Sequence, residues 1–368
     1  MAAPAHSRNH GIDFLRCLSM FFVVVLHVLN WGEAGNLNHS FQGTPSYAVS
    51  WYLELSAYCA VNCFALITGY VGVNVPYRIF RFINLWFQVF FYTVGITFLF
   101  KWLVPGSVSF KGMFQAFFPV LRVAYWYFTA YAVLFCFIPF LNSAIRSLSR
   151  ETGRWLCLLI LIVFSLFSTI SGNGQWLSQG GYSAIWLGCL YVAGGCLGHF
   201  QLWNTLKRPA LYYVLCCILS TAGMIIWGYL PLTPGIAKKL FVAYTAPLCC
   251  LSSFFLLLAC ARMRVSSGAA IRLISFFAPL SFAVYLIHNN PLIWDHIIRA
   301  RFAELQGCPW YVMAAGALGA SVGIYFACSL IDYVRSGLFR LLHIRELSLK
   351  MEGALLKLKQ WILRRIPS

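Results

Sequence analysis

The chain has 368 residues, of which 61% are hydrophobic and only 10% are charged. An ordinary soluble domain is about half apolar and about a quarter charged, so this composition argues against a soluble protein and predicts a protein of the lipid bilayer. The net charge of +18 would suit nucleic acid, but the lysines and arginines fall between apolar segments and near the C-terminal end. That distribution is typical of membrane proteins, so we expect no nucleic-acid partner.

Repeated apolar segments of about 20 residues match the length of a bilayer crossing. The predicted fold class is therefore all-α: a polytopic membrane helix bundle with about ten transmembrane helices. Pro139, Pro247 and Pro279 fall inside these segments, and we expect none of them to divide a span, because neighbouring helices can satisfy the freed backbone groups. The expected helices cover residues 12–31, 50–73, 79–103, 124–143, 154–171, 182–200, 210–229, 239–262, 272–297 and 309–334.

Two further segments are apolar without being expected to cross. Residues 106–122 are too short to span, and we interpret them as a re-entrant or interfacial piece. Residues 346–366 carry Leu and Trp at helical spacing among Lys and Arg, which predicts an amphipathic helix on the anionic membrane surface. We expect a membrane domain over 11–335 and a basic amphipathic cytoplasmic tail over 336–368, with membrane lipids as partners.

The basic residues also predict the orientation of the chain. Twenty Lys and Arg fall on one set of alternate flanks and seven on the other, out of 27 in total. Positive loops stay on the cytoplasmic side, so both termini are expected in the cytoplasm.

Most of the fourteen cysteines lie inside apolar segments, where they serve as small hydrophobic residues. No cysteine spacing resembles a metal site, so we expect no metal.

Ionisable and amide side chains within apolar segments cost several kcal/mol unless a partner or a polar cavity receives them. Arg16 and His27 are eleven positions apart, close to three helical turns, so they project from one face at a separation of about 16 Å. Asp13 lies one turn before Arg16 and can pair with it. Within the expected spans we also single out the polar residues Glu54, Asn62, His288, Asn289 and Asn290.

The predicted topology arranges these residues in two layers. The inner layer contains Arg16 with Arg78 and Arg81, and suits phosphate binding. The outer layer contains His27, Glu54, His288 and Asn289, with Trp126 nearby, and suits proton transfer. Each residue also has a purely structural interpretation: Arg16 as a snorkelling side chain, the arginine pair as a positive-inside anchor, and either histidine as a satisfied packing residue.

Five segments of the chain form a recognisable series: GIDFLRCLSMFFVVVLH (11–27), NCFALITGY (62–70), YRIFR (77–81), AYWYFTAYAVLFCFIPFLN (124–142) and PLSFAVYLIHNNPLI (279–293). Taken together, they resemble the acyltransferase 3 family of bacterial membrane proteins. The likeness covers residues 11 to about 335 in the order of the family, and the one departure is Thr68, where the family usually has Ser.

The resemblance implies an enzyme of the bacterial inner membrane that passes an acyl group, commonly acetyl, from cytoplasmic acyl-CoA to a hydroxyl of a cell-surface glycan or lipid-linked glycan. It implies that Arg16 and His27 are essential and that Arg78 and Arg81 belong to the donor side. It also implies acyl-CoA as a co-substrate and no permanently bound cofactor.

From these residues we expect His27 to act as the general base and Glu54 to orient its ring. We expect His288 or Asn289, with Trp126, to hold the acceptor or the developing oxyanion. A covalent acyl-histidine intermediate stays open. Two rival classes also stay open: a transporter or flippase of a lipid-linked sugar, whose polar residues would line a pathway, and a structural membrane protein.

Overall fold

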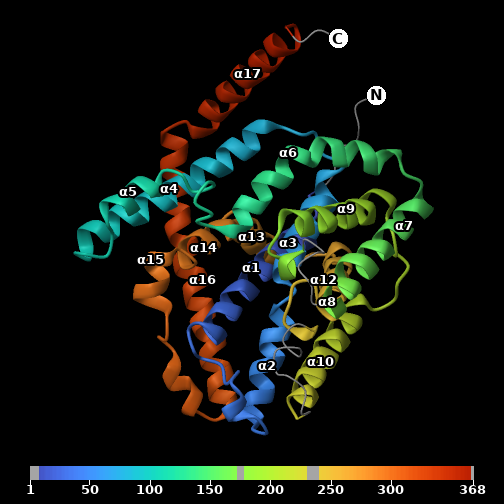
Figure 1. The fold of residues 1–368 in the computed structure, drawn as a ribbon, viewed down its shortest axis with the longest axis vertical. Coiled ribbons are helices and arrows are strands. Elements are labelled where there is room, and N and C mark those ends of the chain that lie inside the picture. Colours follow the sequence, from blue (N-terminus) through green and yellow to red (C-terminus); the bar gives the residue numbers. More distant parts are fainter. Residues whose placement is uncertain (1–7, 172–177, 230–239, 366–368) are drawn as a thin grey trace.

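The structure is a computed structural model that describes residues 8–171, 178–229 and 240–365. Every regular element among these residues is a helix (Figure 1), so the predicted all-α class is confirmed for this part of the chain. The principal helices are α1 (His10–Asn30), α2 (Pro45–Ala57), α3 (Ala60–Gly72), α4 (Ile79–Leu103), α5 (Phe110–Ala116), α6 (Trp126–Ser147), α7 (Arg150–Leu159), the π-helical η2 (Ile160–Phe167), α8 (Ser168–Ser171), α9 (Ala184–Phe200), α10 (Pro209–Gly228), α12 (Pro247–Ala261), α13 (Gly268–Phe277), α14 (Ser281–His288), α15 (Pro291–Ile293), the π-helical η5 (Trp294–Ile298), α16 (Trp310–Leu341) and α17 (Ile344–Leu363).

The helix lengths establish a multi-pass membrane protein. Among the described residues, seven helices or continuous helical runs are long and apolar enough to cross a bilayer, and the bent pair α13–α14 would be an eighth span. Two other apolar helices, α9 and α12, have 17 and 15 residues, which is short for a crossing. The expected number of ten is reached only if the bent pair and both short helices also cross.

The three interior prolines behave differently from one another. Pro139 lies inside the unbroken α6, as predicted. For Pro247 and Pro279, the prediction that the helix continues through the proline is wrong. Pro247 is the first residue of α12, where its missing N–H costs nothing, and Pro279 lies in the break between α13 and α14, whose axes differ by 43°. The expected span 50–73 is covered by α2 and α3, which meet at Tyr58 and Cys59 and together form one candidate span, Pro45–Gly72.

Each of the two segments that were not expected to cross the bilayer contains a helix in the structure. Residues 106–122 contain only the short helix α5, so they form no span. The basic tail forms α17, which projects from one end of the bundle (Figure 1). Helix α16 continues through residue 335 to Leu341, and His343, in a left-handed backbone conformation with φ 51°, turns the chain into α17. Residue 239, the first of one expected helix, lies outside the described residues.

Helix α1 lies between two apolar clusters. One cluster joins α3, α6, α9 and α12, and the other joins α4, α14 and α16, while residues of α1 contribute to both. Helix α1 also contacts α2, α3, α12, α13, α14 and α16. A central helix of this kind can carry functional side chains out of contact with lipid.

Close backbone approach joins α3 to α9. A Cβ atom added at Gly194 would collide with the Leu66 carbonyl, and one added at Gly198 would collide with the Tyr70 carbonyl. In the other direction, Gly69 leaves room for the Tyr191 carbonyl. Small residues allow helices to pack closely within a bilayer, where the hydrophobic effect does not drive them together.

Candidate active site

His27 and His288 form the centre of the candidate site. The Nδ1 atom of His27 lies 2.8 Å from the Nε2 atom of His288, although 261 positions separate the two residues. His288 is only 1% exposed, whereas His27 is half-buried. Both residues end helical stretches, since His27 lies in the last turn of α1 and His288 is the final residue of α14.

The hydrogen bonds define the tautomer of each ring. The Nδ1 atom of His288 lies 2.5 Å from the Val284 carbonyl oxygen, which can only accept, so this nitrogen carries the proton. The Nε2 atom of His288 is therefore an acceptor, and Nδ1 of His27 donates to it. The Nε2 atom of a neutral His27 then keeps its lone pair, the form that a general base requires.

Trp294, the first residue of η5, packs edge-on against the His27 ring. The ring centroids are 5.0 Å apart and the planes are nearly perpendicular, at 87°. Backbone hydrogen bonds hold the segment after η5 against the end of α1. The Ala300 amide donates to the Trp31 carbonyl, and the Phe302 amide donates to the Gly32 carbonyl. These contacts restrict the orientation of the His27 ring, which a positioned base needs.

The break before α15 holds His288 in place. The Asn290 side chain caps α15 by accepting from the Leu292 amide, and its Nδ2 donates to the Tyr125 hydroxyl at 3.0 Å. The Tyr125 hydroxyl in turn donates to the Leu286 carbonyl at 2.8 Å. Asn290 therefore supports the backbone next to His288.

At the other end of α1, Asp13 binds two arginines. Arg8 Nε lies 2.5 Å from Asp13 Oδ2, and Arg16 donates to Oδ1 at 2.7 Å. The Asp13 side chain is 6% exposed and that of Arg16 is 36% exposed. Two cations around one carboxylate leave one net positive charge, which is suited to an anionic ligand.

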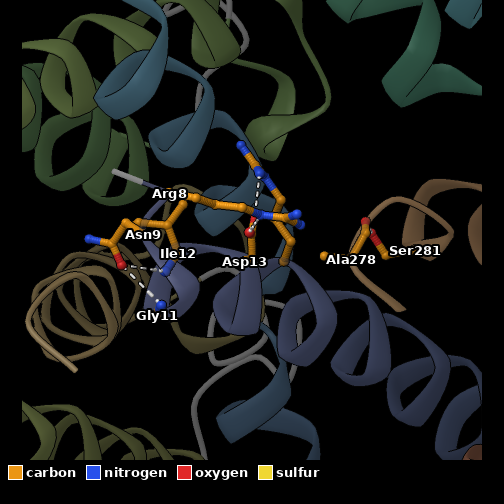
Figure 2. Close-up of polar contacts among 8 residues, drawn as sticks. Arg8, Asn9, Gly11, Ile12, Asp13, Ala278 and Ser281 are labelled. Atoms are coloured by element: carbon orange, nitrogen blue, oxygen red, sulfur yellow. Dashed lines mark hydrogen bonds and ion pairs between the residues drawn. The ribbon is translucent and has the colours of Figure 1, made fainter. Parts of the chain in front are cut away.

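Figure 2 shows how the start of α1 is fixed. The Asn9 side chain accepts hydrogen bonds from the Gly11 and Ile12 amides, a typical N-cap. Ser281, at the break between α13 and α14, lies on the far side of Asp13 from Asn9 in this view. The predicted pairing of Asp13 with Arg16 is present, with Arg8 as an additional partner.

Arg78 and Arg81 lie at the start of α4. Arg78 binds the Glu352 carboxylate of α17 through Nε and Nη2, with the shortest distance 2.8 Å. Arg81 is exposed and makes no ion pair within the part of the chain that the structure describes. The three arginines predicted for the donor side therefore occupy different settings: Arg16 and Arg78 each pair with a carboxylate, and Arg81 faces outward.

Glu54 is buried on α2, with 2% of its surface exposed. Its Oε2 atom has no hydrogen-bond partner among the described residues, and the Asn30 side chain, three positions after His27, lies beside the carboxyl group. The hydrogen bond that orients the His27 ring comes from His288. The structure thus brings Glu54 to the end of α1, beside Asn30.

Trp126 belongs to an aromatic cluster built by four separate segments, Tyr58, Trp126, Tyr182 and Tyr244. The Trp126 ring lies 4.6 Å from that of Tyr182 and is stacked on Tyr244 at 6.0 Å. Tyr244 also packs on Tyr58 at 4.9 Å. Tyr182 is 47% exposed, so one edge of the cluster is accessible.

The aromatic cluster lies near other residues that were predicted for the acceptor. The Tyr58 hydroxyl is close to Glu54, and the Tyr285 hydroxyl is close to Tyr182 and to the Asn289 side chain. Tyr285 precedes His288 by one turn of α14, so it connects the cluster to the helix that carries His288.

Sequence analysis missed four polar or aromatic residues that make notable contacts in the structure. Trp294 gave no signal beyond its position six residues after His288. Asp332 and Arg335 were absent from the set of intramembrane polar residues, because they fall at the end of an expected span, where ionisable groups commonly reach the interface. The Glu352 contact could not be foreseen, since 274 positions separate it from Arg78.

Asp332 is nevertheless fully buried, at 0% exposure. Its carboxylate accepts from Arg335 at 2.8 and 2.9 Å, from the Tyr92 hydroxyl at 2.7 Å and from the Gln88 amide at 3.2 Å. This network joins α4 to α16 and is distinct from the histidine pair. No group of three or more His, Cys, Asp or Glu side chains suited to a metal occurs among the described residues.

The bundle and its site define a class: a multi-pass membrane protein with a hydrogen-bonded histidine pair in its interior and arginines at the ends of its helices. The family follows from comparison with known proteins. A family profile described as an acyltransferase domain, that of the acyltransferase 3 family, matches residues 9–330. The chain belongs to this family, and is a membrane acyltransferase. No curated protein and no solved structure gave a significant match.

Proposed function

We propose that the protein transfers an acyl group, most simply acetyl, from acyl-CoA to a hydroxyl of a cell-surface glycan or lipid-linked glycan in the bacterial inner membrane. The single observation that carries the proposal is the hydrogen-bonded pair of His27 and His288. Its geometry leaves a base nitrogen on a partly accessible ring, next to helix ends that can receive substrates.

In the proposed reaction, Nε2 of His27 removes the proton of the acceptor hydroxyl. The hydroxyl oxygen attacks the thioester carbonyl, a new C–O bond forms and the C–S bond breaks. The proton on His27 then passes to the departing CoA sulfur, so the enzyme returns to its starting state. His288 stabilises the positive charge that develops on His27, by accepting its Nδ1–H.

The donor side of the proposal rests on charge. Arg16 carries the excess positive charge left after Asp13 is paired, and Arg81 is exposed. Arginine binds phosphate oxygens through geometrically matched N–H groups. Arg16 and His27 lie on one face of α1 about 16 Å apart, which suits an extended ligand with phosphates at one end and a thioester at the other.

The acceptor side rests on the aromatic cluster. Aromatic rings present flat apolar faces with polar edges, and such faces can stack on the C–H face of a sugar ring. The exposed edge of Tyr182 and the ring of Trp126 are available for this contact. Glu54, whose Oε2 lacks a partner among the described residues, could accept a hydrogen bond from an acceptor hydroxyl nearby.

One structural feature favours the rival function of a transporter or flippase. The pair α13–α14 is bent by 43° beside the histidine pair, and discontinuous helices form substrate sites in many transporters. Transfer of a lipid-linked sugar across vesicles without consumption of acyl-CoA would support this alternative.

The test is acyl-CoA turnover by the purified protein in lipid, with total surface glycan as the acceptor. We expect His27→Ala to lower turnover by about 10²- to 10⁴-fold, the usual contribution of a general base. His199→Ala is the matched control, because that histidine is half-buried on α9 and, among the described residues, its side chain forms a hydrogen bond with Asn74 rather than with another histidine. Full activity of a folded His27→Ala protein would refute the proposed base.

A further inference from the structure

Glu352 is the least expected contact of the basic tail. Its carboxylate is 5% exposed, although α17 projects from the bundle. Two nitrogens of Arg78 donate to it, at distances of 2.8 to 3.3 Å. The backbone amide of Phe80 also donates to it, at 3.3 Å.

These donors are the groups of an anion-binding position. Arg78 is the N-cap residue of α4 and offers no side-chain cap to its own helix. The first amides of a helix lack intrahelical partners and carry about half a positive charge in total, so they attract anions, and phosphate in particular. Glu352 thus caps α4 from another helix, and supplies an anion beside a residue of the predicted donor side.

The contact of the tail with the bundle is built from polar groups. Among the described residues of α17, only Ser348 and Glu352 are buried, and they lie one turn apart on the side that meets α4. The large apolar side chains are turned outward, with Leu355 at 44% and Trp361 at 52% exposure. A helix held in this way depends on Glu352 more than on apolar burial.

Arg78 lowers the pKa of the Glu352 carboxyl by donating hydrogen bonds to its charged form. A lowered pKa means that the contact is complete at neutral pH and is lost as the pH falls through that lowered value. At physiological pH the Glu352 carboxyl is charged, so protonation does not open the contact. A competing anion that binds Arg78 in its place would open it.

We propose that Glu352 is an internal competitor for the donor's phosphate groups, and that α17 is a latch which acyl-CoA displaces from Arg78 and the Phe80 amide. This inference rests on the proposed function, because it takes Arg78 as part of the donor site. Displacement would exchange a carboxylate for a phosphate at the same donors. It would also free α17, with its exposed leucines and lysines, for the membrane surface.

The first experiment measures binding of CoA and of pantetheine, which lacks the phosphates, to the full-length protein in lipid nanodiscs. We expect Glu352→Gln to bind CoA about fivefold or more tightly than wild type, a typical coupling, and to bind pantetheine unchanged. Glu346→Gln is the matched control, since that residue lies exposed on α17 and pairs only with His343. It should leave both affinities unchanged.

The second experiment uses trypsin cleavage at Lys350, Lys357 and Lys359 to report the position of α17. In wild type we expect CoA to accelerate cleavage in discs of neutral lipid, and in Glu352→Gln we expect fast cleavage without CoA. Acceleration by anionic lipid but not by CoA would overturn the proposal, because the competitor would then be a lipid phosphate.

The latch and the proposed function can fail separately. Unchanged CoA affinity in Glu352→Gln, with acyl transfer intact, overturns the latch alone. Absence of CoA binding in every variant overturns the donor assignment of the proposed function, and the latch with it.

Discussion

His288 connects its own helix to a residue 261 positions away. Its Nδ1 is occupied by the Val284 carbonyl, so only Nε2 is free to accept from His27. The identity of the proton-bearing nitrogens therefore follows from one backbone carbonyl. In the proposed mechanism His288 is therefore a positioning residue for His27, a role that the sequence predicted for Glu54.

We expect His288→Ala to lower kcat for acyl transfer at least about tenfold, a part of the effect of a general base, while the donor KM stays within about twofold. His288→Gln should restore part of kcat, because its side-chain oxygen can accept from His27. Steady-state kinetics on the two variants checks this, and an equal change of KM and kcat would instead indicate a structural role.

Asp332 and Arg335 form a second residue-scale feature. Asp332 is fully buried and the Arg335 side chain is 11% exposed. Removal of one member of such a pair leaves an uncompensated charge, which costs about 3–5 kcal/mol. We expect Asp332→Leu to lower the stability of the purified protein by this amount, and Asp332→Leu with Arg335→Leu to recover most of the loss.

Thermal unfolding in detergent measures both variants. Asp295→Leu is the control, because Asp295 and Arg299 form an exposed pair at 3.2 Å, and exposed pairs contribute about 0–1 kcal/mol. If the double variant were no more stable than the single one, the charge argument would be wrong.

At the scale of elements, the contact of α3 with α9 depends on glycine. Gly194 faces the Leu66 carbonyl, so a side chain there would force the two helices apart. Gly188 lies on the same helix with no atom within 4 Å of an added Cβ. Gly188 is therefore a suitable control position for a substitution at Gly194.

We expect Gly194→Leu to destabilise the bundle by about 1–3 kcal/mol or more, the usual cost of overpacking, and Gly188→Leu to be tolerated. The measurement is the melting temperature of each purified variant in the same detergent. Equal melting temperatures would mean that the helices separate at no cost.

The broken helix α13–α14 is the other element-scale feature. Pro279 lies in the break, which directs α14 toward α1 and α16 and ends α14 at His288. A straight helix over 272–297, as the sequence suggested, would have no end at His288. The position of the histidine pair thus depends on a break that hydropathy alone does not reveal.

At the scale of the whole molecule, the positive-inside distribution predicts that α17 lies in the cytoplasm. We expect trypsin to cleave the tail only in inside-out vesicles, and to cleave at Lys111 or Arg122, which are exposed and belong to the opposite flank, only in right-side-out vesicles. Immunoblotting of the fragments measures both. Tail cleavage from the outside would reverse the predicted orientation.

The sequence by itself determined the membrane class, the all-helical fold and most helix positions, because hydrophobic length and charge placement are local properties of a chain that must satisfy its backbone within lipid. It also singled out Arg16, His27 and His288, since intramembrane polar groups are costly and therefore few. The number of helices that cross was less accessible, because α9 and α12 are short and Pro247 and Pro279 act differently from Pro139.

The tertiary structure alone decided which of these residues meet. The bond between His27 and His288, the position of Trp294 and the capping of α4 by Glu352 join segments that are hundreds of positions apart. Hydrophobic periodicity specifies which face of a helix is buried, but it does not specify the neighbouring helix or its register. Contacts of that kind depend on the packing of the entire bundle, and the candidate site consists of them.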